Sequence, residues 1–189
     1  YYYDANGELH KGWLNTENGY YYLNLSTGKM TVGWEKINNK WYYFQGNGVM
    51  ATGWVKDNGK YYYLLTDGTM HTGWVSIDNV YYYLSDSGAM ATGWVNMDNG
   101  WYYFDPNDGK CTVNLAREIN DSWYMFGKDG KMLTGWQQVD GAYYYFHTDG
   151  RMLTGWLSDG TNSYYMDPAN GCMSTGWKQI EGAYYYFNN

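Results

Sequence analysis

Short runs of apolar and aromatic residues alternate with polar, glycine-containing turns along the whole chain. Seven residues after the tryptophan of most Gly-Trp pairs, an aromatic triplet such as Trp41-Tyr42-Tyr43 begins. A methionine follows nine or ten residues after the triplet begins, and the next tryptophan comes four residues later. Trp34, Trp54, Trp74 and Trp94 are each 20 residues apart. This spacing predicts an array of small repeats that are stabilised by stacking on their neighbours.

Each repeat is predicted to form a β-hairpin, because turn-forming dipeptides lie between the tryptophan and the triplet. Asn, Asp and Gly tolerate the positive φ angles that a two-residue type I′ turn requires. The dipeptides are Asn38-Asn39, Asn58-Gly59, Asp78-Asn79, Asp98-Asn99, Asp140-Gly141 and Glu181-Gly182. The array is therefore expected to be all-β.

A turn at Asn38-Asn39 fixes the register of its hairpin, and it pairs Trp34 with Tyr43 and Lys36 with Trp41. Side chains alternate between the two faces of a strand. Trp34, Trp41 and Tyr43 are therefore expected on one face. The opposite face carries Ile37, Tyr42 and Phe44.

The composition favours a recognition surface over a purely buried core. Aromatic residues make up 22% of the 189 residues, with 25 Tyr and 11 Trp but only 5 Phe. Tyr and Trp suit half-exposed positions because they keep a polar group. The formal charge of −7 argues against nucleic acid as a partner. No apolar run approaches the ~20 residues of a membrane span, so membrane insertion is not expected.

The chain starts at Tyr1-Tyr2-Tyr3, an aromatic triplet without its Gly-Trp pair, and has neither an initiating Met nor a signal peptide. We expect it to be a piece of a longer protein. No enzyme is predicted, because His10, His71 and His147 lie in loops or turns without a recurring acid or nucleophile. The Asp-Gly pairs at Asp67, Asp129 and Asp149 are explained as turns rather than calcium loops. No metal or cofactor is expected.

Two or three rings with a thioether can form a cage for a quaternary ammonium ion. Ring faces carry partial negative charge and attract a cation that has no hydrogen bond to donate. Aromatic packing alone accounts for the same pattern, so the periodicity leaves both interpretations open.

The run of Gly-Trp, Trp/Tyr-Tyr-Tyr-Phe/Leu, Gly-x-Met and Thr-Gly-Trp resembles the repeat of choline-binding modules in pneumococcal-type Gram-positive cell-surface proteins and cell-wall lytic enzymes. The resemblance covers essentially the whole chain. It implies a left-handed β-solenoid of stacked β-hairpins, built from ~20-residue repeats with about three hairpins per turn. It also implies one module over residues 1–189, with about nine to ten repeats that are degenerate near 111–126. Any effector domain would lie outside this chain.

The function that the resemblance implies is noncovalent attachment to the bacterial cell wall. The ligand would be phosphorylcholine on teichoic and lipoteichoic acids, and the protein would be a secreted surface protein with a role in adhesion or virulence. A homodimer through the tyrosine-rich end at residues 184–187, or a host-protein partner, stays open.

The resemblance also implies a ligand site between consecutive hairpins. The Gly-Trp tryptophan and first triplet aromatic of one hairpin would combine with the third triplet aromatic of the next and with the intervening methionine. Five positions match this pattern: Trp13, Tyr20, Met30 and Tyr43; Trp34, Trp41, Met50 and Tyr63; Trp54, Tyr61, Met70 and Tyr83; Trp74, Tyr81, Met90 and Tyr103; Trp136, Tyr143, Met152 and Tyr165.

Three other positions depart from the pattern; the two in the central stretch are expected to interrupt the row of sites, and binding at the third stays open. After Trp94 and Trp101, Cys111 replaces the methionine and Met125 the closing aromatic. Asn114-Leu115 replaces the next Gly-Trp pair. The expected site with Trp123, Met132 and Tyr145 therefore lacks its first aromatic residue. Near the end, Ser163 takes an aromatic position between Trp156 and Tyr186.

Two alternatives to choline binding stay open. The glucan-binding repeats of glucosyltransferases and the repeats of clostridial toxins are similar in period and in Tyr-Tyr-Phe content, and sugars also stack on aromatic rings. The second alternative is adhesion or assembly through protein contacts. Whether Cys111 and Cys172 form a disulfide is also open, since an extracellular setting permits one while stacked hairpins separate them.

Overall fold

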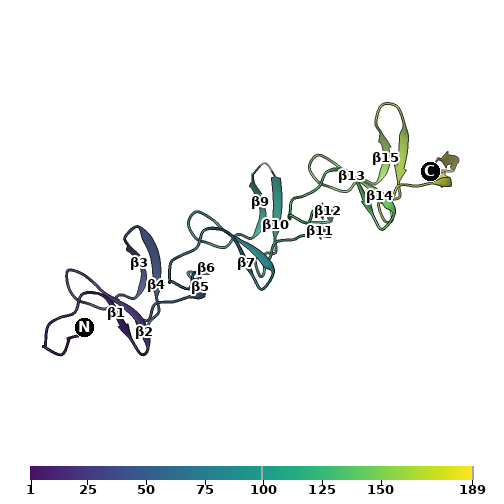
Figure 1. Ribbon diagram of the computed structural model, residues 1–189. Coiled ribbons are helices and arrows are strands. Elements are labelled where there is room, and N and C mark those ends of the chain that lie inside the picture. The colour runs from purple at the N-terminus through teal and green to yellow at the C-terminus, as the bar shows by residue number, and fades with distance from the viewer. Residues whose placement is uncertain (99, 189) are drawn as a thin grey trace. The chain divides into compact units, whose positions relative to one another are not determined.

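The computed structural model describes residues 1–98 and 100–188. The chain forms two compact units, Tyr1–Ala91 and Thr92–Asn189. In the described residues, regular secondary structure consists of short β-strands that pair in sequence order into antiparallel two-stranded hairpins (Figure 1). The all-β array of repeated hairpins predicted from the sequence is confirmed.

The strands are four or five residues long. The first unit contains β1 (Gly12–Thr16), β2 (Gly19–Leu23), β3 (Gly33–Ile37), β4 (Lys40–Phe44), β5 (Gly53–Asp57), β6 (Lys60–Leu64), β7 (Gly73–Ile77) and β8 (Val80–Leu84). The second contains β9 (Gly93–Met97), β10 (Gly100–Phe104), β11 (Leu115–Ile119), β12 (Ser122–Phe126), β13 (Gly135–Val139), β14 (Ala142–Phe146), β15 (Gly155–Ser158), β16 (Ser163–Met166), β17 (Gly176–Ile180) and β18 (Ala183–Phe187).

The predicted turns and register are confirmed where the structure describes them. Asn38 and Asn39 have φ angles of 50° and 64°, as a type I′ turn requires. Trp34 pairs with Tyr43, and Lys36 with Trp41. Positive φ angles recur at the predicted turns that begin at Asn58, Asp78, Asp98, Asp140 and Glu181. Asn99, the second residue of one predicted turn, lies outside the described residues.

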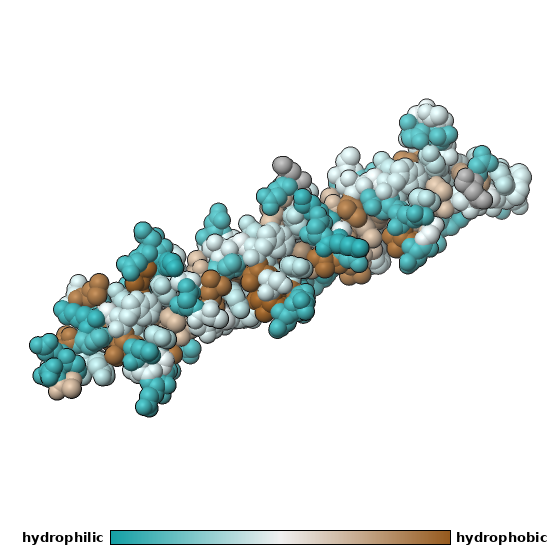
Figure 2. Space-filling model, in the orientation of Figure 1, coloured by the Kyte–Doolittle hydropathy of each residue, from teal (hydrophilic) through white to brown (hydrophobic). Residues whose placement is uncertain are grey.

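Within each unit, the tryptophan-bearing face of one hairpin packs against the opposite face of the next. Tyr22 of the first hairpin is buried with Ile37 and Phe44 of the second. The last residue of each second strand points into the core; Phe44 and Phe126 are completely buried. Burying each such side chain stabilises the stack by about 1.5–3 kcal/mol. In Figure 2 the projecting tips are hydrophilic, and the hydrophobic patches lie between them.

The linkers connect each hairpin to both of its neighbours. Met50 forms an isolated β-bridge with Phe44 of the hairpin just completed. The Met50 amide donates a hydrogen bond to the Tyr20 carbonyl, one hairpin earlier, at 2.7 Å. Its thioether lies under Gly68 in the following linker, where an added Cβ would overlap the sulfur. The methionine therefore links three consecutive segments. A single hairpin is only marginally stable in water, so it depends on such contacts with its neighbours.

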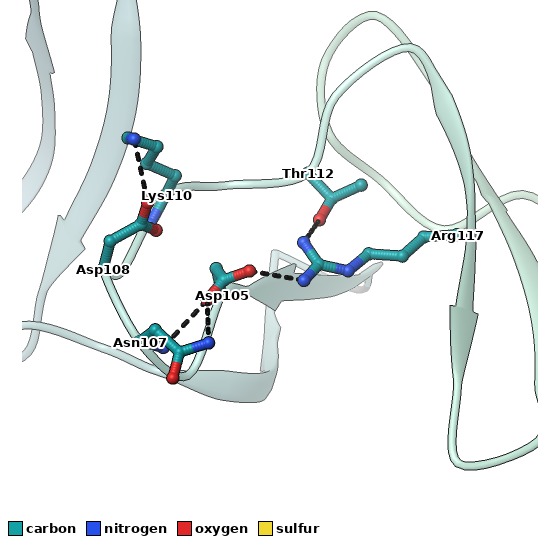
Figure 3. A network of polar contacts seen from close by, with 6 residues as sticks. All are labelled: Asp105, Asn107, Asp108, Lys110, Thr112 and Arg117. Carbon is teal, nitrogen blue, oxygen red and sulfur yellow. Dashed lines mark hydrogen bonds and ion pairs between the residues drawn. The ribbon is translucent and has the colours of Figure 1, made fainter.

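The linker after β10 is ten residues long, compared with eight between β6 and β7, and an ion pair fastens it to the next hairpin. Figure 3 shows the Arg117 guanidinium donating to the Asp105 carboxylate and to Thr112. Asn107 also donates to Asp105. Hydrogen bonds from Arg117 and Asn107 hold the pKa of Asp105 below its ordinary value. Lys178 and Asp167 form the corresponding pair in the linker after β16.

Both cysteines carry free thiols. Cys111 is buried and lies against Gly130, and burial raises the pKa of its thiol to about 11. The half-buried Cys172 thiol donates a hydrogen bond to the Tyr144 hydroxyl at 3.1 Å.

Candidate functional site

Each Gly-Trp tryptophan begins the first strand of a hairpin and meets two tyrosine rings. Trp34 packs edge-on against Tyr43, its cross-strand partner, with ring centroids 5.0 Å apart. Its other neighbour is Tyr62 of the following hairpin, at 4.8 Å and an interplanar angle of 66°. The same contact with the following hairpin recurs along the chain: Trp13 with Tyr42 at 5.0 Å, Trp54 with Tyr82 at 5.1 Å, Trp94 with Tyr124 at 4.8 Å, Trp136 with Tyr164 at 4.9 Å, and Trp156 with Tyr185 at 5.0 Å.

The first triplet aromatic lies diagonally across the hairpin on the same face as the tryptophan. These rings are not buried: Trp41 is 42% exposed and Tyr61 39%. Trp54, on the other strand, is 37% exposed. Rings that served only as packing would be covered, so open ring faces point to a surface that receives a ligand.

The methionine whose backbone reaches the first triplet aromatic comes from the linker after the following hairpin. The Met70 amide donates to the Trp41 carbonyl at 2.8 Å, and the Met90 amide donates to the Tyr61 carbonyl at the same distance. Met30, like the other linker methionines, bridges to the last strand residue of its own hairpin, Leu23, and its thioether lies against Gly48 in the following linker. The methionine that reaches Tyr20 is Met50.

The structure therefore unites the predicted tryptophans and first triplet aromatics, but it assigns their other neighbours differently. The third triplet residue packs on the tryptophan of its own hairpin, as Tyr63 does on Trp54 at 5.1 Å and Tyr165 on Trp156 at 5.2 Å. The second triplet residue reaches the preceding hairpin. Sequence reasoning missed these rings: Tyr42, Tyr62, Tyr82, Tyr124 and Tyr164.

We call each such set a cage and name it by its tryptophan. Five cages are complete within the two units: Trp13, Tyr20, Tyr42 and Met50; Trp34, Trp41, Tyr62 and Met70; Trp54, Tyr61, Tyr82 and Met90; Trp94, Trp101, Tyr124 and Met132; Trp136, Tyr143, Tyr164 and Met173. The set predicted from Trp74, Tyr81, Met90 and Tyr103 takes members from both units, and it stays a prediction.

At Trp94 the structure brings together other residues than those expected from the sequence. Cys111 and Met125 were expected to leave this position incomplete, and whether it binds a ligand stays a prediction. Trp94 instead meets Trp101 at 6.3 Å and Tyr124 at 4.8 Å, and the Met132 amide donates to the Trp101 carbonyl at 2.7 Å.

The next position is incomplete, and its register differs from the expected one. Leu115 pairs with Phe126 and Ala116 with Met125, so Leu115-Ala116, rather than Asn114-Leu115, takes the place of Gly-Trp. The remaining rings are Trp123 and Tyr144, and the Met152 amide donates to the Trp123 carbonyl at 2.8 Å. At the Trp156 position, Tyr185 approaches to 5.0 Å, while Ser163 is exposed in place of an aromatic.

Two cages carry a lysine beside their exposed ring. Lys36 Nζ lies 5.9 Å from the centroid of Trp41, and Lys56 Nζ lies 5.1 Å from that of Tyr61. The two lysines are the cross-strand partners of these rings, and a ring face attracts a cation at this range. Burial, with a smaller contribution from the Asp67 charge, raises the pKa of Tyr42, so this wall of the Trp13 cage stays a neutral phenol at neutral pH.

The described residues contain no group of three or more side chains suited to holding a metal ion. They also contain no helix with the length and apolarity that a membrane crossing would need.

Two family models match the sequence. A choline-binding repeat model matches residues 31–72, 71–115 and 133–175, which together make up more than half of the chain. A putative cell wall binding repeat model matches residues 117–132 and 175–189. No curated protein matches by sequence.

Solved structures of Streptococcus pneumoniae proteins resemble this chain. Choline binding protein F is 33% identical with a TM-score of 0.80, over 93% of this chain and 61% of that one. It was also crystallised in the presence of a peptidoglycan analogue. CbpJ from strain TIGR4 is 27% identical, with a TM-score of 0.73 over 100% of this chain and 88% of that one. The choline-binding domain of CbpL is 27% identical, with a TM-score of 0.62 over 84% and 94%.

Proposed function

We propose, since this chain belongs to the family of choline-binding repeat proteins, that it attaches noncovalently to phosphorylcholine on teichoic and lipoteichoic acids. The five cages are the proposed ligand sites. The repeats imply association with the cell surface, and we propose that the protein is secreted to reach it. The chain acts as the binding module, and any catalytic activity of a longer protein would reside elsewhere.

The observation that carries this proposal is the exposed first triplet aromatic of each cage, which lies beside a tryptophan that is itself exposed or half-buried. In the Trp34 cage, Trp34 and Trp41 come from one hairpin and Tyr62 from the next. Their faces can surround a trimethylammonium group, which has no hydrogen bond to donate and so needs no carboxylate. Each ring contributes about 0.5–2 kcal/mol. After the cost of immobilising the ligand, one cage is expected to bind near the millimolar range, about −4 kcal/mol.

Lys36 and Lys56 favour phosphorylcholine over free choline at two of the cages. Each ammonium lies beside a ring that would hold the quaternary ammonium of the ligand. A second cation at that position repels choline but pairs with a phosphate attached to it. The Trp34 and Trp54 cages are therefore expected to prefer the phosphorylated ligand more than the Trp13 cage, where Asn15 takes the lysine position.

A single millimolar site would not retain a protein on a surface. Teichoic acids repeat phosphorylcholine along a polymer, so several cages can bind one polymer at once. Effective concentration can then increase retention by about 10²- to 10⁴-fold without any new contact. A homodimer through residues 184–187, or a host-protein partner, stays a hypothesis.

The test is elution of the chain from choline-coated resin and from teichoic-acid-bearing cell walls. We expect release by millimolar free choline but not by about 1 M NaCl, because ring faces are screened less than exposed ion pairs. Trp34→Ala and Trp54→Ala together should shorten retention much more than either change alone. Trp177→Ala is the matched control, because this 73% exposed tryptophan lies outside the five cages and should leave retention unchanged.

Carbohydrate binding is the second candidate, supported by the crystallisation of choline binding protein F with a peptidoglycan analogue. Elution by glucans or by peptidoglycan fragments, with no effect of choline, would favour this candidate and contradict the choline proposal.

A further inference from the structure

Asp57 is the last residue of β5 and lies on the same face of its hairpin as Tyr62, the face that meets Trp34. Its side chain is half-buried, and its Oδ2 accepts a hydrogen bond from the Trp34 indole Nε1–H at 3.3 Å. Asn58 Nδ2 donates to the same oxygen at 3.0 Å, and Lys60 is the cross-strand partner of Asp57. The Trp34 cage therefore has a carboxylate at the edge of its tryptophan.

The corresponding position differs in the other four cages. In the Trp136 cage it is Asp159, whose carboxylate accepts hydrogen bonds from two loop amides and from the Tyr164 hydroxyl. In the hairpins that follow Trp13, Trp54 and Trp94, the position holds an isoleucine: Ile37, Ile77 and Ile119. Among the described residues, a carboxylate bonded to the indole therefore distinguishes the Trp34 cage.

The hydrogen bond restricts the orientation of the Trp34 ring. An indole has a single N–H donor, which lies in the plane of the ring. A hydrogen bond to a charged acceptor is stronger than one between neutral groups. Because Asp57 holds this edge from the next hairpin, the ring face that Trp34 presents to a ligand is set before the ligand arrives.

The carboxylate also places a negative charge close to the proposed position of the ligand's ammonium group. A cation within about 6 Å of the ring centre lies roughly 8 Å from a carboxylate bonded at Nε1. At about 8 Å, a unit charge changes the affinity for a cation by about two- to sixfold, at effective dielectric constants of about 80 to 40. The same charge repels a phosphate, so its net effect on phosphorylcholine is smaller than its effect on choline.

The two cages that carry a lysine therefore differ in charge. Lys36 Nζ lies 5.9 Å from a ring centroid of the Trp34 cage, to which Asp57 adds a negative charge. The Trp54 cage has Lys56 in the equivalent place but the uncharged Ile77 at the position of Asp57. The lysine is thus offset in one cage and not in the other.

We propose that Asp57 is a specificity-determining residue of the Trp34 cage. It holds the Trp34 indole by its N–H edge, and it makes the preference of this cage for phosphorylcholine over free choline smaller than that of the Trp54 cage. The inference rests on the proposed function for its ligands. The contact between Asp57 and Trp34 is a property of the ligand-free chain and is measured separately.

The test uses the full chain labelled with 5-fluorotryptophan and observed by ¹⁹F NMR, with the Trp34 and Trp136 signals assigned by Trp34→Phe and Trp136→Phe. Asp57→Asn removes the charge and keeps the size of the side chain. At about 50 mM salt, we expect it to raise the Kd of choline at Trp34 by about threefold and to change that of phosphorylcholine much less. About 0.5 M NaCl should remove most of this difference, and both Kd values at Trp136 should stay unchanged.

Asp78→Asn is the matched control, because it removes the same charge from a turn of the next hairpin, where asparagine tolerates the φ of 52°. It should leave the ratio of the two Kd values at Trp34 within about 1.5-fold. Asp57→Ile introduces the residue found at Ile37 and Ile77 and removes the acceptor. In the ligand-free chain it should shift the Trp34 indole N–H signal upfield in ¹H–¹⁵N spectra and speed its exchange with solvent.

The outcomes separate this inference from the proposed function. Choline binding at Trp34 and Trp136 with no response of the Trp34 ratio to Asp57→Asn would overturn the inference and leave the proposed function in place. Equal weakening of both ligands would assign Asp57 a structural role alone, and an indole signal unmoved by Asp57→Ile would contradict its contact with Trp34. If neither ligand binds at either tryptophan, the proposed function fails and the specificity role fails with it.

Discussion

Replacing Tyr62 by leucine tests which ring of the following hairpin completes a cage. Tyr62 meets Trp34 of the preceding hairpin at 4.8 Å, whereas Tyr63 packs on Trp54 of its own hairpin at 5.1 Å. Leucine keeps an apolar side chain at the interface between hairpins but removes the ring face. We therefore expect Tyr62→Leu to weaken choline binding at the Trp34 cage specifically.

The magnitude follows from the number of rings. The Trp34 cage has three, and each contributes about 0.5–2 kcal/mol to the attraction of the cation. Losing one corresponds to a Kd about 2- to 30-fold higher at that cage. The Trp136 cage lies in the other unit and shares no residue with this one, so its Kd should stay within experimental error.

The assay is a choline titration of the 5-fluorotryptophan-labelled chain, in which the Trp34 and Trp136 signals report their own cages. Tyr63→Leu is the matched control, with the same chemical change one position along the strand. It should leave the Trp34 Kd within about twofold. A larger loss at Trp34 from Tyr63→Leu than from Tyr62→Leu would refute the assignment of the second triplet residue.

Two further predictions concern stability. Gly68→Ala should destabilise the first unit by about 1–3 kcal/mol in thermal or chemical unfolding, because it adds a Cβ at a φ of +81° against the Met50 thioether. Gly46→Ala is the control; Gly46 faces open space, so this change should be nearly neutral. The folded pKa of Asp105 lies below its unfolded value, so its pairing with Arg117 stabilises the fold above about pH 4 and is lost as pH falls through the lower folded pKa. Asp105→Asn should therefore flatten the acid side of the stability curve measured by chemical denaturation between about pH 2 and 6, and an unchanged curve would contradict this role.

The register within hairpins could be predicted from the sequence because it is a local property. A two-residue turn at Asn38-Asn39 leaves one way to pair the flanking strands, so the Trp34–Tyr43 pair follows directly. The residues that stand in place of the Gly-Trp pair before Trp123 could also have been predicted from the sequence. Counting seven residues back from Trp123 leads to Ala116, which the structure confirms, whereas searching for a substitute of the Gly-Trp pair led to Asn114-Leu115.

The composition of the cages was harder to predict because it depends on how hairpins stack. Tyr42 lies on the face opposite to Trp34, and this is the face that the preceding hairpin meets. The alternation of faces was sufficient to select Tyr42 once the stacking direction was known, but the sequence does not give that direction. The methionine of each cage was harder still to predict from the sequence, because the hydrogen bond from Met50 to Tyr20 joins segments 30 residues apart.

Each cage combines two successive hairpins and the linker after them. This arrangement determines how a gene that encodes such repeats can change in length. In the first unit, the walls supplied by a following repeat stand at equivalent positions, as Tyr42 with Met50 and Tyr62 with Met70 do. Unequal recombination that removes or duplicates one whole repeat therefore gives the preceding tryptophan a new neighbour with the same tyrosine and methionine. The number of cages then changes by one, while every junction stays intact. Loss of half a repeat would separate a tryptophan from both of its partners, so whole-repeat changes are the ones that selection can use to adjust how firmly the chain is held.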